Sequence, residues 1–155
     1  MRLLLICVLA LVASLGESAS AADVPIVVSD AWMRATVPAQ QSATVFMRIT
    51  ASADTTLTGA ATPVAKLAEL HSMTQEAGVM KMRPLERLPI RAGTTVALTP
   101  EGTHLMLTGL AHQIREGDVV PISLSFVDAQ GRASRVDVAV KAGAVTAMGR
   151  AGKDP

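Results

Sequence analysis

This chain has little cysteine and few aromatic side chains, and neither positive nor negative charge is in clear excess. It has a single cysteine, Cys7, and aromatic residues make up only 2% of the 155 residues, with one Trp and no Tyr. One cysteine excludes an intramolecular disulfide, and so few aromatic side chains exclude the stacking platform of a single-strand nucleic-acid binder. The net charge is +1, and there is no basic run. Nucleic acid is therefore not an expected partner.

The chain begins with the pattern of a secretory signal peptide. Arg2 gives a positive start, 3–12 is an apolar run too short to span a membrane, and small residues follow. We expect a signal peptide over 1–22, cleaved near residue 21 or 22, and a periplasmic protein with no stable membrane insertion. Cleavage would remove Cys7, which does not match a lipidation site because Ile6 stands where a small residue is needed.

The remaining sequence predicts one all-β domain over 23–141, followed by a disordered tail over 142–155. Short segments of alternating or β-branched residues are separated by Gly- and Pro-containing turns, which is typical of a β-sandwich. A helical turn is expected near residue 66, because the residues there are poor strand formers. The expected strands are 26–28, 31–35, 43–50, 57–61, 94–98, 104–108, 119–127 and 135–140.

The chemically distinctive residues lie between positions 71 and 106. Three short pairs each place two metal-binding side chains two residues apart: His71-Ser72-Met73, Met80-Lys81-Met82 and His104-Leu105-Met106. On a β-strand, residues i and i+2 point to the same face, so each pair would present its side chains together. The alternative is ordinary packing, since Met often fills irregular cores. Three such pairs in one short stretch favour a ligand cluster.

The first two pairs are expected on the two arms of a β-hairpin. A four-residue loop over 75–78 would place Met73 opposite Met80 and His71 opposite Met82. Directly opposed residues have Cβ atoms about 4.5–5.5 Å apart. The hairpin would therefore gather these four side chains on one face, and a third strand starting at the rim of the sandwich would add the remaining pair.

Thioether sulfur and imidazole nitrogen restrict the metal that such a cluster could bind. Soft, neutral thioethers suit Cu(I) far better than Mg²⁺, Ca²⁺ or Mn²⁺, and copper also accepts imidazole. A blue-copper site is excluded because it needs a thiolate. A zinc site of two imidazoles and a carboxylate would leave the methionines unexplained. The pattern favours Cu(I).

The spacing of four of these residues matches a known signature. Ten residues separate His71 from Met82, twenty-one separate Met82 from His104, and one separates His104 from Met106. The pattern resembles, without gap or substitution, the H-x10-M-x21-H-x-M signature of the periplasmic copper chaperones called PCuAC. The segments 31–35, 78–84 and 116–121 resemble the same family.

This resemblance covers roughly residues 24 to 141 and implies a cupredoxin-like sandwich. It also implies one Cu(I) ion held by the two histidines and two methionines of the signature. The ion would be delivered toward the binuclear copper centre of cytochrome c oxidase, to its copper-centre subunit or alongside a Sco-type copper protein. Some family members carry a His- and Met-rich tail with a second copper site. The tail here has Met148 and no His, which argues for one site.

Another class of function stays open. The domain could be a metal-free adaptor in the assembly of an envelope complex, with its methionines forming an apolar contact patch. An enzyme is not expected, because the chain has no G-x-S-x-G, H-E-x-x-H or P-loop motif and no thiolate to support copper redox chemistry.

Several residues outside the signature have expected roles of their own. Met73 and Met80 share the predicted ligand face, and they could form its apolar wall or assist ligation. His112 is expected to be an exposed loop residue. Trp32 and Met47 lie in alternating segments and are expected to pack in the structure.

Overall fold

The computed structural model describes residues 24–146, and every regular element in this range is a β-strand. No helix in the described part of the chain is long and apolar enough to cross a membrane. The predicted signal peptide and residues 147–155 of the predicted tail lie outside the described range, so both stay predictions. The ten strands are β1 (Ile26–Arg34), β2 (Ser42–Ala51), β3 (Thr55–Ala61), β4 (Ala65–Glu76), β5 (Val79–Pro84), β6 (Leu88–Ile90), β7 (Thr95–Leu98), β8 (His104–Leu110), β9 (Val119–Asp128) and β10 (Ala133–Gly143).

All ten strands belong to one sheet that curls into a sandwich. The order is β5-β4-β8-β2-β1-β10-β9-β3-β6, and β7 pairs with β2 next to β8. β1 joins the two halves, because it pairs antiparallel with β2 and parallel with β10. Its register shifts between Ser29 and Trp32, where Asp30 has a φ of 51°. The predicted all-β sandwich is confirmed.

Alternation along the strands builds the core. In β9, buried and solvent-facing residues alternate strictly from Val120 to Phe126, which are 2% and 0% exposed. β2 turns Val45, Met47 and Ile49 into the same core from the other half of the sheet. The predicted packing of Met47 is confirmed, since its exposed fraction is 1%.

The segment that begins at Ala65 is a strand from its first residue. β4 pairs antiparallel with β8 from Ala65 to His71, and Leu70 is buried in the core. The helical turn expected near residue 66 is therefore wrong. Pairing with β8 and burial of one face outweigh the weak strand propensity of these residues, because β propensity depends strongly on context.

The hairpin of β4 and β5 has a different register from the one expected. Its turn contains only Ala77 and Gly78, with φ values of 50° and 80°, as a type I′ turn requires. Met73 consequently lies opposite Met82, and the predicted four-residue loop over 75–78 is wrong by two residues. A shift of two residues keeps every side chain on its face. The predicted common face is thus preserved.

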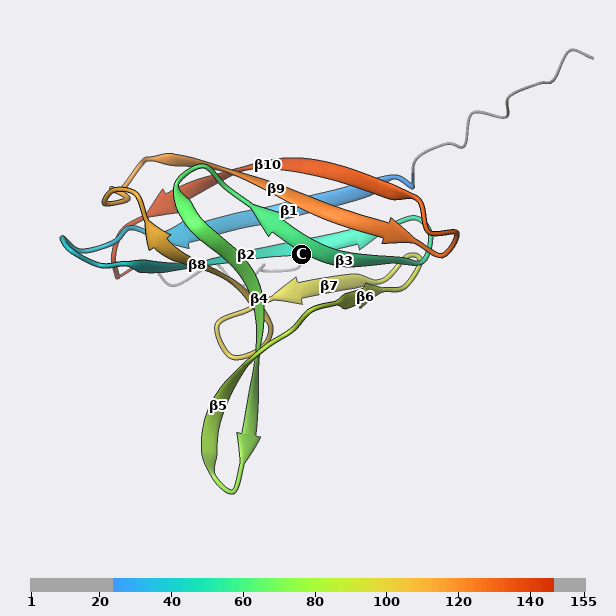
Figure 1. Cartoon of the computed structure of the whole chain (residues 1–155), viewed down its shortest axis with the longest axis horizontal. Coiled ribbons are helices and arrows are strands. Elements are labelled where there is room, and N and C mark those ends of the chain that lie inside the picture. Colours follow the sequence, from blue (N-terminus) through green and yellow to red (C-terminus); the bar gives the residue numbers. More distant parts are fainter. Residues whose placement is uncertain (1–23, 147–155) are drawn as a thin grey trace, which may run out of the picture.

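This hairpin projects away from the sandwich (Figure 1). Every residue of β5 is exposed. Lys81 Nζ and Arg83 donate hydrogen bonds of 2.8 and 2.9 Å to the Glu76 carboxylate, on the face opposite the methionines. Lys81, with Arg83 second, holds the pKa of Glu76 below its ordinary value. These exposed pairs cross-link the two arms of the hairpin, and pairs of this kind add little stability.

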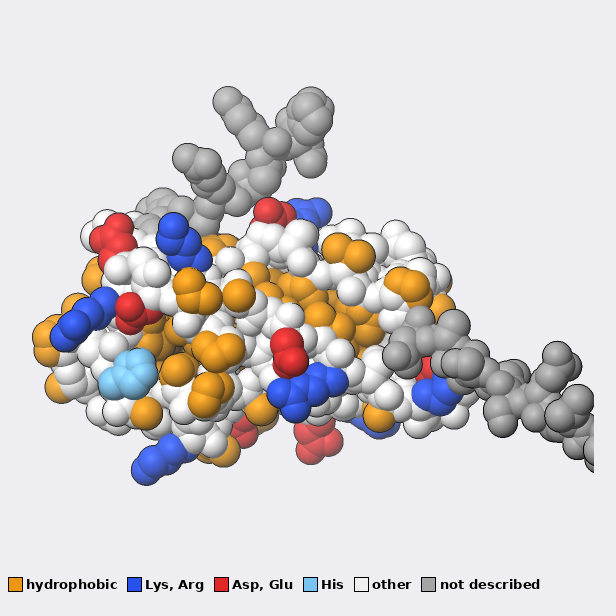
Figure 2. All heavy atoms as spheres, turned by 90° about the horizontal axis from the view of Figure 1, so that it is seen from above, with side chains coloured by type: hydrophobic (Ala, Val, Ile, Leu, Met, Phe, Trp, Pro, Cys, Tyr) orange, Lys and Arg blue, Asp and Glu red, His pale blue; other side chains and the backbone are white. Residues whose placement is uncertain are grey.

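The side of the sandwich away from the hairpin has no field of one charge sign. Figure 2 shows this side from above, with basic and acidic side chains scattered among hydrophobic ones.

Candidate metal site

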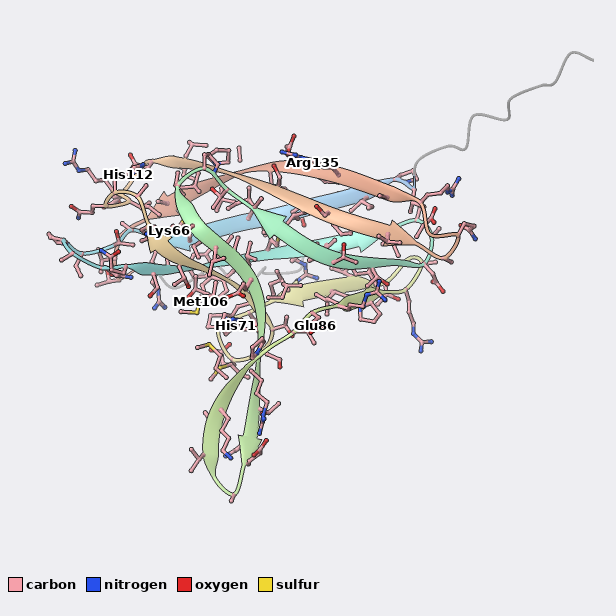
Figure 3. The ribbon with its side chains drawn as sticks, in the orientation of Figure 1. Lys66, His71, Glu86, Met106, His112 and Arg135 are labelled. Carbon is pink, nitrogen blue, oxygen red and sulfur yellow. The ribbon has the colours of Figure 1, made fainter. Side chains whose placement is uncertain are left out.

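Two histidines meet where the hairpin leaves the sandwich. His71 of β4 lies directly opposite His104 of β8, and their ring centroids are 6.1 Å apart. Their strand neighbours Leu70 and Leu105 face the core, so the two imidazoles lie on the outer face of the sheet. His104 is nevertheless only 5% exposed. Figure 3 labels His71 at the base of the hairpin.

The Gly102 carbonyl orients His104 and anchors the hairpin. It accepts a hydrogen bond from His104 Nδ1 at 3.2 Å and another from the Met73 backbone N–H at 3.3 Å. A carbonyl only accepts, so Nδ1 carries the proton and Nε2 keeps its lone pair for a ligand. His104 is the first residue of β8, which confirms its predicted place at the start of a strand.

One ring nitrogen of His71 is buried without a hydrogen-bond partner among the described residues. Within residues 24–146, its Nδ1 is buried and has no hydrogen-bond partner. Its Nε2 lies 3.8 Å from a Glu69 carboxylate oxygen, which is longer than a hydrogen bond. An unpartnered buried polar atom costs about 1–3 kcal/mol. A metal ion at Nδ1 would remove this cost, so the residues present fit a metal.

Met106 extends the outer face along β8. It lies two residues beyond His104 and opposite Glu69 of β4, so it is diagonal to His71. In Figure 3, Met106 and His71 lie on the same side of the sandwich. Diagonal neighbours are about 7–8 Å apart, within reach of a long side chain.

Met82 approaches from the other side of β4. His71 lies opposite Pro84, so the prediction that it lies opposite Met82 is wrong, as is the pairing of Met73 with Met80. Met82 is again a diagonal neighbour of His71 on the same face. The four predicted ligands thus lie on one face of three adjacent strands, β5, β4 and β8.

No site of hard donors competes with this one. In the described range 24–146, no three residues among His, Cys, Asp and Glu gather in a group that could hold a metal ion. The side-chain donors next to the histidine pair on the same face include the thioethers of Met82 and Met106.

An aromatic pair continues the same face toward β1. Trp32 lies opposite Phe46, with ring centroids 4.6 Å apart. β2 and β8 pair Val45 with Leu105, and the next step of that register places Phe46 beside His104. The predicted packing of Trp32 is confirmed. Sequence reasoning missed Phe46 as a neighbour of the site, and the only signal was its place in an alternating strand.

His112 takes no part in the site. It is exposed in the loop after β8, where its Nδ1 bonds to the Gln113 carbonyl at 3.1 Å, as expected of a loop histidine. Figure 3 shows it on the sandwich, far from the hairpin.

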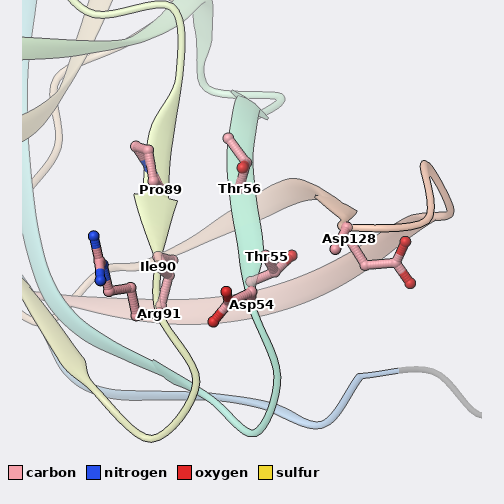
Figure 4. Close-up of a pocket in the computed structure, with 8 residues that line it drawn as sticks. Asp54, Thr55, Thr56, Pro89, Ile90, Arg91 and Asp128 are labelled. Atoms are coloured by element: carbon pink, nitrogen blue, oxygen red, sulfur yellow. The ribbon is translucent and has the colours of Figure 1, made fainter.

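An open pocket of about 420 Å³ lies where β3 meets β6 and β9 (Figure 4). Its carboxylates are already engaged: Asp54 accepts the Ala92 N–H, and Asp128 accepts bonds from Gln130 and Arg132. We therefore assign it no ligand. The lining residues are Asp54, Thr55, Thr56, Pro89, Ile90, Arg91, Asp128 and Ala129.

Comparison with known proteins shows the family to which this chain belongs. Residues 26–142 match the model of the LpqE-like family, described as "Putative lipoprotein LpqE-like". The chain belongs to the LpqE-like family. A curated relative, "Putative lipoprotein Lxx21020" of Leifsonia xyli subsp. xyli (strain CTCB07), is 32% identical over 117 residues, which are 74% of this chain and 68% of the relative.

Solved structures similar to this LpqE-like chain are PCuAC domains and a related solution structure. The apo PmoF2 PCuAC domain has a TM-score of 0.62 at 18% identity, covering 79% of this chain and 93% of that domain. Apo-DR1885 from Deinococcus radiodurans has a TM-score of 0.56 at 29% identity, covering 92% and 96%. Its CuI-DR1885 form has a TM-score of 0.51 at 31% identity, covering 81% and 83%. The predicted PCuAC relationship and cupredoxin-like fold are confirmed.

Proposed function

We propose that this LpqE-like protein is a copper chaperone that binds one Cu(I) ion through His71, Met82, His104 and Met106. The observation that carries the proposal is the buried, unpartnered Nδ1 of His71 beside the oriented imidazole of His104. The Cu(I) form of DR1885, 31% identical to this chain, supports copper as the ion. The protein then acts as a carrier and not as an enzyme.

Two neutral imidazoles and two neutral thioethers add no charge to the bound ion, which favours Cu(I) over Cu(II). The thioethers bind weakly enough to be exchanged one at a time for the ligands of a recipient. The imidazoles must be neutral to bind, so Cu(I) affinity falls as the solution becomes acidic.

The proposed recipient is the binuclear copper centre of cytochrome c oxidase, reached directly through its copper-centre subunit or through a Sco-type copper protein. Both lie in the bacterial envelope, and the predicted signal peptide and the lipoprotein description of the relatives support export to that compartment. The outward position of the hairpin gives a recipient access to the ion.

The experiment that tests the proposal is replacement of Met82 and Met106 by Leu, which keeps size and apolarity but cannot ligate. Cu(I) affinity is measured by competition with a chelator, with Met47→Leu as the control in the core. We expect each ligand substitution to weaken binding by about tenfold or more, as loss of one metal-site interaction does. The control should bind as the native protein does.

The same variants separate the chaperone from the metal-free adaptor. A chaperone lacking both thioethers should fail to restore oxidase activity in copper-limited cells that lack the native protein. Full restoration by the M82L/M106L variant would favour the adaptor, because Leu preserves an apolar contact patch.

A further inference from the structure

Three methionines share the ligand face of the projecting hairpin. Met73 of β4 lies directly opposite Met82 of β5, and Met80 lies two residues from Met82, opposite Gln75. Opposed Cβ atoms are about 4.5–5.5 Å apart, and residues i and i+2 of a strand about 7 Å apart. Met has three rotatable side-chain bonds, so these thioethers can converge on a single ion.

The exposure of the histidine and methionine side chains on this face falls from the tip of the hairpin to its base. Met80 and Met82 are 49% and 47% exposed, and Met73 is half-buried. At the base, the side chain of His71 is 14% exposed and His104 only 5%. Core packing does not account for Met80, because half of it faces solvent. Soft donors thus run from solvent to the histidine pair.

The other face of the hairpin holds its two arms together without using these donors. Glu76 bonds to Lys81 and Arg83 there, and the Thr74 hydroxyl donates to the Lys81 carbonyl. The Glu76 carboxylate is therefore turned away from the methionines. The methionine face carries three thioethers beside the neutral amide of Gln75. Thioether sulfur selects soft monovalent ions over hard divalent ones.

We propose that Met73, Met80 and Met82 form an outer, all-thioether station through which Cu(I) enters and leaves the protein. This inference rests on the proposed function of the inner site. Met82 belongs to both ligand sets, so the ion moves inward by exchanging its other thioethers for the imidazoles while Met82 stays bound. The ion remains Cu(I) throughout, and no proton is needed at the outer station, because thioethers carry none.

The first test uses Ag(I), a soft monovalent ion that does not change oxidation state, and a protein labelled with ¹³C at its methionine methyl groups. In the H71Q/H104Q variant, which lacks the inner imidazoles, we expect one Ag(I) to bind and to shift the methyl resonances of the three station methionines. Adding M73L and M80L should abolish this binding, and adding M47L in the core should not. Absence of binding by H71Q/H104Q, or binding that survives M73L/M80L, would overturn the inference.

The second test keeps both histidines, in case the H71Q/H104Q variant does not fold. Release of Cu(I) to a water-soluble chelator is followed in M80L, with V79M as a matched control that adds a thioether to the opposite face. We expect M80L to slow release by about tenfold and uptake by a similar factor, because the ion crosses the station in both directions. The equilibrium affinity, which is the ratio of the two rates, should then change less than about threefold. Native release kinetics in M80L would contradict the station. If the native protein itself bound no Cu(I), the proposed function, and not only the outer station, would be refuted.

Discussion

Replacing Gly102 by Ala should disturb the site, because the Gly102 carbonyl accepts hydrogen bonds from both His104 and Met73. A Cβ added at Gly102 would lie 2.9 Å from the Thr99 hydroxyl oxygen, closer than real Cβ contacts. Both backbone groups of Thr99 are bonded within the turn, so the hydroxyl or the Gly102 carbonyl must move. An off-rotamer side chain costs about 0.5–1.5 kcal/mol, and a weakened hydrogen bond a similar amount. We expect G102A to lower the free energy of unfolding by about 1–3 kcal/mol.

The same change should weaken copper binding, because the added Cβ crowds the turn that holds the Gly102 carbonyl, and this carbonyl orients the His104 ring. Loss of such an orienting partner typically costs about 10- to 100-fold in metal affinity. The assay is Cu(I) competition combined with urea unfolding. Gly59→Ala is the matched control, since a Cβ there meets no atom within 4 Å. The T99A/G102A double variant removes the clashing hydroxyl and should recover most of the affinity.

Either of two results would refute this reasoning. One is native Cu(I) affinity in G102A. The other is a folded T99A/G102A protein that binds as weakly as G102A, because the coupling between neighbouring positions should then be absent.

Three further predictions concern the hairpin and the aromatic pair. Replacing Ala77 by Asn should stabilise the hairpin by about 1 kcal/mol, because Asn tolerates the positive φ of this position better than Ala, and slower amide exchange in β5 would show it. Acidification should loosen the hairpin, because the pKa of Glu76 is lowered in the folded protein. The stability that the Glu76 carboxylate adds is present above the ordinary glutamate pKa and is lost as the pH falls through the lowered value. Unchanged amide exchange in the hairpin at low pH would contradict this. Binding of Ag(I) should change the fluorescence of Trp32, the sole Trp, through Phe46, and F46L should reduce that response.

Alternating side chains predicted the core strands well. The pattern of β2 and β9 has a period of two, which local sequence shows directly. The start of β4 could not be read in this way. Its residues have weak strand propensity, and its conformation depends on pairing with β8, which lies more than thirty residues away in the chain.

In the candidate site too, features set by neighbouring residues could be predicted from the sequence, and features set by pairing of distant strands could not. The common face of the hairpin follows from the period of two and survived an error in register. The register itself depends on Ala77 adopting a positive φ, which an alanine does not signal. The meeting of His71 with His104, and the shared bonds of the Gly102 carbonyl, arise from long-range pairing. From the sequence, the three short His and Met pairs suggested that the two histidines belong together, and the spacing of the PCuAC signature strengthened that prediction.

Cu(I) titration with X-ray absorption at the copper edge tests the central claim most directly. The account predicts one bound Cu(I) with both sulfur and nitrogen scatterers, from the thioethers and imidazoles that β5, β4 and β8 bring to one face. A protein that binds no Cu(I), or that surrounds copper with nitrogen and oxygen alone, would contradict it.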